Sequence, residues 1–382
     1  MSESIESSGY PLAFRVKDGT RPTLLGNGEG QSTFTTEARL LNGHQKEAIV
    51  SEGDGGPIWR VTSDEGLHLK GTDLAPFPLG FFNAGMQGDL LSRIASGALS
   101  ANIPMTDVKL SLRNFYWMTG SFIKGDGEGF ADSPEVRLQA PKQYVESLQG
   151  IAEAAKRASP AFHAVESPLQ NTFALYVNGR RKPVIGMSPC DSDDVIDPYV
   201  SYSTPPAPDA STRPDPIRKT GIVEDGEVKP APAATKTRIV RTVSGHSSFS
   251  DNMSSVNTDT WLEMPGVSHF ALSSDDRLDG DRAPSALSLL SAGVAFCYMT
   301  QLSRYIDNMK LDINGVRLVQ LSPYQVSDGV GSAKPVETHL FLNGHADVET
   351  HAKLLSVAAK TCYLHATLAA SLPIDIHVES AG

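Results

Sequence analysis

The residues best suited to redox or nucleophilic chemistry in this sequence are its three cysteines. Cys297 and Cys362 each lie in an apolar, helix-like segment, whereas Cys190 lies in an acidic one. A thiolate is the reactive form of cysteine, and it can attack oxygen, sulfur or carbon. Three cysteines in 382 residues do not form a disulfide scaffold, and the sequence has no Cys-x-x-Cys or His-x-x-x-His pair. We therefore expect individual thiols to act without a metal or another cofactor.

The composition is typical of a globular protein. Hydrophobic residues make up 40% of the chain and charged residues 20%. The net charge of -11 and the lack of a Lys/Arg run argue against nucleic acid as a partner. The first ten residues are polar and acidic, unlike those of a signal peptide. No apolar stretch reaches the roughly 18 residues of a membrane helix, and the one that comes nearest is 286–298. We therefore expect a cytoplasmic protein without membrane contact.

A proline- and alanine-rich segment near the middle of the chain predicts two domains. Residues 203–235 lack apolar periodicity and have the composition of an extended linker. Short matches recur in the same order, at nearly constant separation, on its two sides. They pair Arg39 to His44 with Arg241 to His246, Ala75-Pro76 with Ala283-Pro284, Ala84-Gly85 with Ala292-Gly293, Val108 to Leu110 with Val316 to Leu318, and Ala154 to Lys156 with Ala358 to Lys360. We therefore expect a tandem duplication, with one domain at 1–202 and the other at 236–382.

Each part of the chain predicts the same succession of elements. Alternating apolar residues indicate early strands, and longer apolar segments opened by proline indicate helices. The predicted pairs are strands at 32–41 and 237–243, helices at 78–100 and 284–309, strands at 108–117 and 316–325, helices at 141–158 and 348–371, and strands at 172–177 and 375–378. The fold class expected is α+β, with two long helices against a curved, mainly antiparallel sheet in each domain.

The contexts of Cys297 and Cys362, with the order of elements around them, resemble the OsmC/Ohr family of cysteine peroxidases. In that family one cysteine follows a helix that opens on proline and is rich in small residues. The other sits in a later helix after an Ala/Lys-rich turn. Segments 284–297 and 358–362 match these two contexts. The resemblance covers most of residues 237–378 and, more faintly, residues 32–177.

The resemblance implies that Cys297 is the peroxidatic cysteine and Cys362 the resolving one. Attack of the Cys297 thiolate on an O–O bond would give a sulfenic acid, which Cys362 would convert into a disulfide. An external dithiol would then reduce that disulfide. The family also places an arginine on an amino-terminal strand, where it favours the thiolate. Arg39 and Arg241 are the candidates here, with Arg238 behind them.

The sequence departs from the family's pattern at two places. The family usually carries a Glu ten residues before the first cysteine, where it positions the arginine, but this chain has Leu287. Either an acid reaches in from elsewhere, or the arginine is organised differently, or this domain no longer performs the usual cycle. The first part of the chain has Asp89 and Ala158 at the positions that match the two cysteines, so it lacks a redox pair. Because single-domain members are intertwined dimers with sites at the subunit interface, we expect a single-chain pseudodimer with one working site.

Apolar side chains near Cys297 predict the type of substrate. Phe296 and Met299 flank the cysteine, and Phe81 and Phe82 lie in the matching helix of the first part. Such a lining favours an organic hydroperoxide over hydrogen peroxide, because pockets gain affinity mainly by apolar burial. The competing interpretation is that these residues are core, the more frequent fate of an apolar helical stripe.

The sequence therefore predicts a thiol-dependent peroxidase of OsmC/Ohr type, with an apolar hydroperoxide as substrate and an external dithiol as reductant. Two alternatives stay open. Cys297 could be the nucleophile of a hydrolase or lyase acting on an apolar small molecule, or the chain could bind such a molecule without catalysis. Both cysteines could also serve as small hydrophobes. Cys190 has no counterpart in the family and is interpreted as a bystander, and association of two chains into a homo-oligomer is left open.

Overall fold

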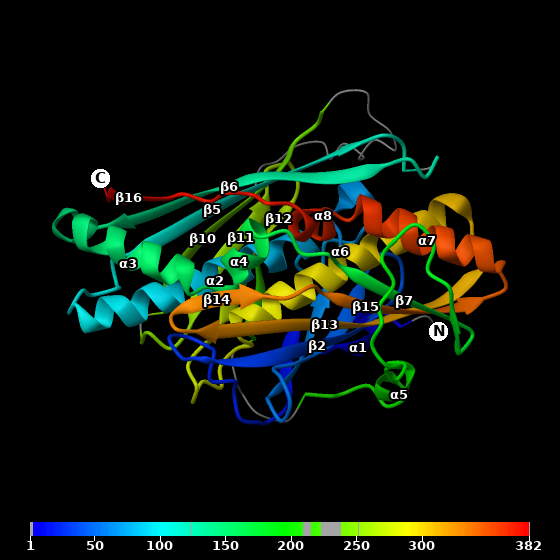
Figure 1. Ribbon diagram of the computed structural model, residues 1–382, viewed down its shortest axis with the longest axis horizontal. Coiled ribbons are helices and arrows are strands. Elements are labelled where there is room, and N and C mark those ends of the chain that lie inside the picture. Colours follow the sequence, from blue (N-terminus) through cyan, green and yellow to red (C-terminus); the bar gives the residue numbers. More distant parts are fainter. Residues whose placement is uncertain (1–2, 123, 209–214, 223–237, 251, 382) are drawn as a thin grey trace.

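The computed structural model describes residues 3–122, 124–208, 215–222, 238–250 and 252–381. Two β-sheets enclose two long helices, so the molecule has the α+β class predicted from the sequence (Figure 1). The helices are α1 (Ile5–Ser8), α2 (Pro78–Ser100), α3 (Val145–Arg157), α4 (Pro160–Glu166), α5 (Tyr199–Tyr202), α6 (Ala286–Met309), α7 (Val348–Thr361) and α8 (Tyr363–Ala369). The strands are β1 (Ala13–Lys17), β2 (Gly30–Leu40), β3 (Lys46–Ser51), β4 (Ile58–Ser63), β5 (Lys109–Thr119), β6 (Glu128–Ala140), β7 (Thr172–Val177), β8 (Arg180–Lys182), β9 (Ile217–Ile222), β10 (Arg241–Phe249), β11 (Val256–Leu262), β12 (Ser268–Ser274), β13 (Ile313–Ser327), β14 (Val330–Ala333), β15 (Glu337–Gly344) and β16 (Ile376–Ser380).

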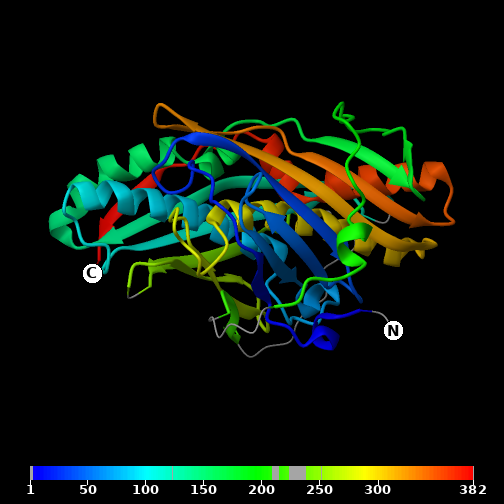
Figure 2. The ribbon, with the colours of Figure 1, turned by 90° about the horizontal axis from the view of Figure 1, so that it is seen from below.

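Each sheet combines strands from both parts of the chain. The first sheet has the order β1-β4-β3-β2-β13-β15-β7-β8, with β14 on β13, and the second has the order β16-β6-β5-β10-β11-β12-β9. At the centres of the sheets, β2 pairs with β13 and β10 pairs with β5, both antiparallel; Figure 2 shows β2 and β13 side by side. Further along, β7 joins β15 and β16 joins β6 in parallel. The same succession therefore occurs twice, with the first and second parts of the chain exchanged.

The two long helices cross where the sequence has its matched Ala-Gly pairs. α2 packs on the second sheet and α6 on the first, and the helices pack on each other between the sheets. A Cβ atom added at Gly85 would lie 2.6 Å from the backbone nitrogen of Leu290, and one at Gly293 would lie 2.8 Å from that of Phe82. Only glycine allows two helix backbones to approach this closely. The repeated glycines are therefore explained by the crossing itself.

Helix α6 is more apolar than the sequence analysis expected. By length and composition it could cross a membrane, with a mean hydropathy of 1.3 over its most apolar window. That window is 100% buried inside the molecule. The apolar character of α6 is therefore accounted for by its place between α2 and the first sheet.

The second predicted helix of each part is followed or interrupted by a break in the structure. The expected helix at 348–371 is interrupted at Cys362, which has an extended ψ of 112° and lies between α7 and α8. The expected helix at 141–158 begins later, at Val145, and a further short helix, α4, follows a similar break at Ser159. Periodicity alone did not predict the break at Cys362 because the apolar pattern continues across it.

The predicted linker is partly a strand. Within residues 203–235, β9 pairs antiparallel with β12 at the edge of the second sheet, although this segment was expected to lack regular structure. Its strand character arises from pairing with a neighbour, because its own residues have little apolar alternation. Residues 209–214 and 223–235 of the predicted linker lie outside the described residues.

Candidate active site

Cys297 and Cys362 meet although they lie on separate helices. Cys297 projects from the middle of α6, and Cys362 lies at the break between α7 and α8, where the chain turns. The Cys297 side chain lies close enough to Cys362 to act on its thiol, as do the backbone N–H groups of Leu364 and His365 at the start of α8. Both cysteines are buried and neither is in a disulfide.

The two thiols differ in environment. Burial raises the pKa of Cys362 well above its usual range, and the neighbouring Cys297 raises it further. Cys362 therefore keeps its proton at neutral pH. Cys297 lines a pocket, whereas Cys362 is 0% exposed and lies behind it. Only Cys297 can meet a molecule that enters from solvent.

The pocket beside Cys297 is small and mostly apolar. Its volume is ≈ 90 Å³, well above the roughly 10–15 Å³ that one water molecule requires. Both parts of the chain line it: Glu65, His68, Leu69, Phe77, Pro78, Leu79 and Met118 come from the first part, and Ile239, Arg241, Leu262, Cys297, Thr300, Gln301, Arg304 and Tyr363 from the second.

Arg304 is the cation that the structure places with Cys297. It follows Cys297 by two helical turns on α6, so both side chains lie on the pocket face of this helix. Its guanidinium lies 4.7 Å from the centre of the Phe122 ring and donates to Gln301 Oε1 at 3.0 Å. Burial lowers the pKa of Arg304, and the charges of Tyr363, Glu65 and Cys297 oppose that effect. Arg304 was not among the arginines predicted from the sequence, although its helical spacing from Cys297 could have identified it.

The three arginines predicted from the sequence lie at different places relative to the pocket. Arg241 lines the pocket, and its Nη1 lies 3.3 Å from the Met264 sulfur. Arg39 lies outside the pocket, paired with Glu47 at 2.6 Å and with Glu3. Arg238 pairs with Asp132 and lies 4.5 Å from the centre of the Trp117 ring. Of these three, only Arg241 reaches the space next to Cys297, because β10 begins at the rim of the pocket while Arg39 is held in a surface ion-pair network.

An acid reaches the pocket from the first part of the chain. Glu65, which follows β4, accepts hydrogen bonds from Thr300 and from the buried ammonium of Lys46, the latter at 3.3 Å. Lys46 also donates to Thr300 Oγ1 at 2.9 Å. Thr300 lies one turn after Cys297 on α6, so this network fixes Glu65 beside the pocket. Glu65 is therefore an acid that reaches the pocket from a segment far from Leu287, and nothing in the local sequence around residue 65 would have identified it.

His68 and Tyr116 are two further polar residues of the first part near the thiols. Burial lowers the pKa of His68 to about 4, and Arg241 and Arg304 lower it as well. His68 is therefore neutral at neutral pH, and its Nδ1 has no hydrogen-bond partner among the described residues. Tyr116 is buried with its hydroxyl likewise unpaired in the described structure, and the charges of Cys297 and Cys362 act on it. Of the two, His68 lines the pocket and is available to an entering molecule or to water.

The apolar residues expected to line the pocket lie elsewhere. Phe81, Phe82, Phe296 and Met299 are all 0% exposed. The rings of Phe81 and Phe296 pack edge to face at 5.3 Å between α2 and α6. These four residues belong to the core between the sheets: two lie on α2 and two on α6, and none of them lines the pocket.

Asp89, at the position in α2 that matches Cys297, has structural partners. It pairs with Arg93 at 3.0 Å and accepts a hydrogen bond from Ser159 at the break before α4. The residue at that break, Ser159, is one position beyond Ala158, which was expected to match Cys362. The corner that holds two thiols in the second part of the chain thus holds a carboxylate and a hydroxyl in the first.

Comparison with known proteins gives a family for the part of the chain that contains the thiols. Residues 278–377 match the family described as OsmC-like protein. None of the curated proteins matches the chain. A solved structure of an OsmC-like hydroperoxide resistance protein from Jannaschia sp. CCS1 is similar at 24% identity over 32% of this chain and 81% of that one, with a TM-score of 0.22. The part of the chain that holds Cys297 and Cys362 is therefore an OsmC-like domain, spanning residues 278–377.

Proposed function

We propose that this protein is a thiol-dependent peroxidase that reduces organic hydroperoxides. The observation that carries the proposal is the contact between two reduced thiols of which only one, Cys297, lines a pocket. A peroxidatic cysteine must meet substrate, and a resolving cysteine must meet the peroxidatic one. Cys297 and Cys362 have these two placements.

The reaction proceeds in three balanced steps. The Cys297 thiolate attacks the terminal oxygen of ROOH, the O–O bond breaks, and the alkoxide leaves as ROH after taking a proton. The sulfur of Cys362, losing its proton, then attacks the sulfenic sulfur of Cys297, and water leaves as the disulfide forms. An external dithiol returns both cysteines to thiols by thiol–disulfide exchange and is itself oxidised to a disulfide.

Arg304, with Arg241 at the rim, stabilises negative charge during the first step. A fixed cation in a water-poor site lowers the energy of charge that develops on the sulfur and on the departing oxygen. Glu65 holds the polar wall in place through Thr300, which lies one turn from Cys297. This arrangement combines two of the alternatives raised by Leu287, since the acid comes from another segment and the arginine comes from α6.

The substrate is proposed to be an organic hydroperoxide because the remainder of the pocket is apolar. Beyond the polar groups near the sulfur, its lining consists of side chains such as Leu69, Phe77, Leu79, Met118 and Ile239. An alkyl or aryl group gains free energy by burying its surface against such residues, whereas hydrogen peroxide has no apolar surface to bury.

The test measures free thiols and peroxide consumption together. Wild-type protein is titrated for thiols under denaturing conditions before and after exposure to cumene hydroperoxide, alongside Cys297→Ser and Cys362→Ser. We expect wild type to fall from three thiols per chain to one, with a Cys297–Cys362 peptide found by mass spectrometry. Cys297→Ser should consume no peroxide. Cys362→Ser should turn over once and retain a sulfenic acid that a dimedone probe captures.

Thermal unfolding of each variant serves as the folding control, because a serine in place of a buried cysteine adds a polar group to the core. Peroxide consumption by Cys297→Ser would overturn the proposal. Full catalytic turnover of peroxide by Cys362→Ser would mean that the external thiol reduces the sulfenic acid directly, and would contradict the role proposed for Cys362.

A further inference from the structure

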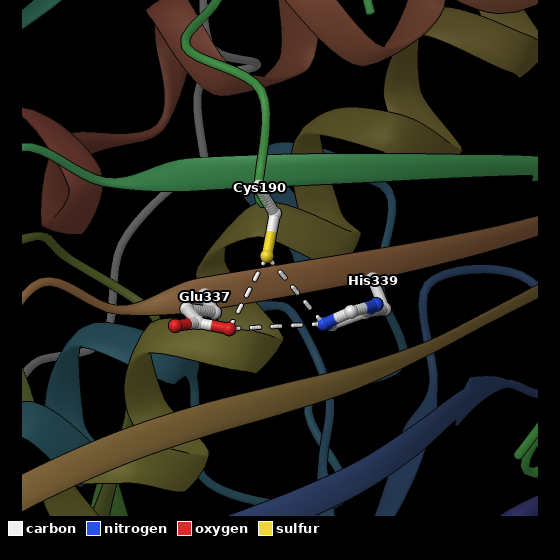
Figure 3. Close-up of side chains that lie close together, drawn as sticks. All are labelled: Cys190, Glu337 and His339. Atoms are coloured by element: carbon white, nitrogen blue, oxygen red, sulfur yellow. Dashed lines mark hydrogen bonds and ion pairs between the residues drawn. The ribbon is translucent and has the colours of Figure 1, made fainter. Parts of the chain in front are cut away.

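Cys190, interpreted from the sequence as a bystander, belongs to a second cluster of reactive side chains. It lies on the opposite face of the first sheet from α6, in a separate small group of buried residues with Ala174, Tyr176, Val319 and Phe341. The Cys190 side chain points at Glu337 and His339, which lie two residues apart on β15 and therefore on one face of the sheet (Figure 3). The proposed peroxidase makes no use of these three residues.

The distances within this cluster are those of a metal site. The Cys190 sulfur lies 3.2 Å from Glu337 Oε2 and 3.8 Å from His339 Nε2, and the latter two atoms are 4.0 Å apart. Zn²⁺ bonds of about 2.3 Å to sulfur and about 2.0–2.1 Å to nitrogen or oxygen, in tetrahedral geometry, place ligand atoms roughly 3.4–3.6 Å apart. The three atoms therefore need to move by only a few tenths of an ångström to coordinate one ion.

We propose that Cys190, Glu337 and His339 bind a single Zn²⁺-like transition-metal dication through Sγ, a carboxylate oxygen and Nε2, with the fourth position open to solvent. A thiolate, an imidazole and a carboxylate are the donor types that Zn²⁺ accepts, and the softness of the thiolate disfavours Mg²⁺ and Ca²⁺. One thiolate and one carboxylate also balance the charge of the dication. The Glu337 side chain is 32% exposed, which leaves an approach for the ion and for a water ligand.

The surroundings hold the three ligands in position. Backbone hydrogen bonds tie the Cys190 segment to β7, from Cys190 to the Phe173 carbonyl at 2.7 Å and from Phe173 to the Ser188 carbonyl at 2.9 Å. Arg181 of β8 donates to the Cys190 carbonyl at 2.8 Å. The cysteine is thus fixed over the sheet before any ion binds.

His339 is oriented as metal-bound histidines are. Its second ring nitrogen, Nδ1, lies 3.4 Å from the Tyr176 hydroxyl, which donates to Asp194 at 2.8 Å. Partners on the second nitrogen set the ring orientation of a ligating histidine and typically affect metal affinity by 10–100-fold.

The experiment uses the full chain carrying Cys297→Ser and Cys362→Ser, so that Cys190 is its only thiol. This parent is freed of metal with a chelator, titrated with Co²⁺ and followed by absorption. We expect one Co²⁺ per chain, a near-ultraviolet thiolate-to-cobalt charge-transfer band, the visible bands of tetrahedral cobalt, and displacement by equimolar Zn²⁺. The measurement contains no peroxide, so its outcome is independent of the proposed peroxidase.

Variants of the parent separate coordination from general electrostatics. Cys190→Ser should abolish the charge-transfer band. Glu337→Gln and His339→Gln should each weaken Co²⁺ binding by at least about tenfold, because loss of even a residue that only supports a ligand typically weakens metal binding by 10–100-fold. Asp193→Asn is the matched control, because it removes a neighbouring exposed carboxylate that is not a ligand. It should leave the Kd within about threefold of the parent.

A parent chain that takes up no cobalt, or a charge-transfer band that survives Cys190→Ser, would overturn the proposal. An Asp193→Asn effect as large as that of Glu337→Gln would do the same, since binding would then follow net charge. If Cys190→Ser does not fold, thermal unfolding decides: Zn²⁺ should raise the Tm of wild type but not of Glu337→Gln, because an ion stabilises only the state that binds it.

Discussion

Cys297 and Cys362 are identical side chains whose surroundings give them different properties. Cys297 lies at a pocket wall near Arg304, while Cys362 is enclosed beside Cys297 and has a raised pKa. The asymmetry arises from position on the helices, because the middle of α6 faces the pocket and the break before α8 lies behind it. The charges around Cys297 can therefore be tested one residue at a time.

Replacing Arg304 should slow oxidation of Cys297. We expect Arg304→Gln to lower the second-order rate constant with cumene hydroperoxide by roughly 10²-fold or more, the usual effect of removing one preorganised charge-stabilising donor. Arg304→Lys should retain more activity because the charge remains. The measurement is the initial rate of thiol loss at neutral pH. Arg39→Gln is the control, since Arg39 lies outside the pocket and should leave the rate unchanged; equal losses in both variants would count against Arg304.

Asp276 should make stability fall as the pH rises. Its carboxylate accepts from the Ala286 N–H at 2.8 Å, and burial, with a smaller contribution from Asp89, raises its pKa from 3.8 to about 7. Between these values the folded state holds a proton that the unfolded state has lost, so this group's contribution to the free energy of unfolding decreases from about pH 4 to pH 7 and is level above. A shift of this size corresponds to roughly 4 kcal/mol.

We expect Asp276→Asn to gain stability relative to wild type across that range, by an amount on the order of 4 kcal/mol between pH 4 and pH 8. Urea unfolding of both proteins at a series of pH values gives the difference and cancels the other titrating groups. Parallel stability curves for the two proteins would show that Asp276 is ionised normally in the fold.

The two long helices act as one element because their backbones are in contact at Gly85 and Gly293. The helix breaks then bring a second helix of each part toward this pair. Cys362 before α8 meets Cys297 of α6, and Ser159 before α4 meets Asp89 of α2. The same corner between helices therefore carries thiol chemistry in one part and a carboxylate network in the other.

A methyl group at the helix crossing should destabilise the fold. Gly293→Ala would place a Cβ atom 2.8 Å from the Phe82 nitrogen, so the helices must separate, and we expect a loss of about 1–3 kcal/mol in the free energy of unfolding. Gly150→Ala is the matched control, because Gly150 is also in a helix but has nothing within 4 Å of its added Cβ. That variant should be stabilised by roughly 0.5–1 kcal/mol through helix propensity. Urea unfolding measures both, and a stable Gly293→Ala would mean that the crossing can relax.

At the scale of the whole molecule, strands of the two parts are exchanged between the sheets. β5 and β6 of the first part complete the sheet of β10 to β12, and β13 and β15 complete the sheet of β1 to β4. The repeated strand order, with β9 placed on β12 as β1 is placed on β4, supports our proposal that the chain is a fused pair of copies. Neither copy can complete a sheet or enclose the pocket by itself.

We therefore predict that fragments 1–208 and 209–382 are inactive alone and active together. The second fragment includes β9, because β9 pairs with β12. It lacks Glu65, His68 and Phe77 of the pocket, so it should show neither native near-ultraviolet circular dichroism nor peroxidase activity. Co-expression should give a complex with both. Peroxidase activity of fragment 209–382 as a monomer would contradict this prediction.

The sequence by itself determined several of the elements and the two cysteines on which the proposed function depends. The bounds of α2 and β7 agree with those predicted, and the contexts of Cys297 and Cys362 indicated the family now matched at residues 278–377. Local periodicity and composition suffice for such features, because a helix or strand is selected largely by residues close in the chain.

The tertiary structure alone decided which residues surround those thiols. Glu65 reaches the pocket from a distant loop, and Cys190 meets Glu337 and His339 only because β7 and β15 pair in parallel. Contacts between residues far apart in the chain depend on strand order and helix packing, which no local pattern encodes. Arg304 combines a local and a long-range feature. Its helical spacing from Cys297 can be read from the sequence, but the packing of α6 between α2 and the first sheet decides which face of the helix borders the pocket.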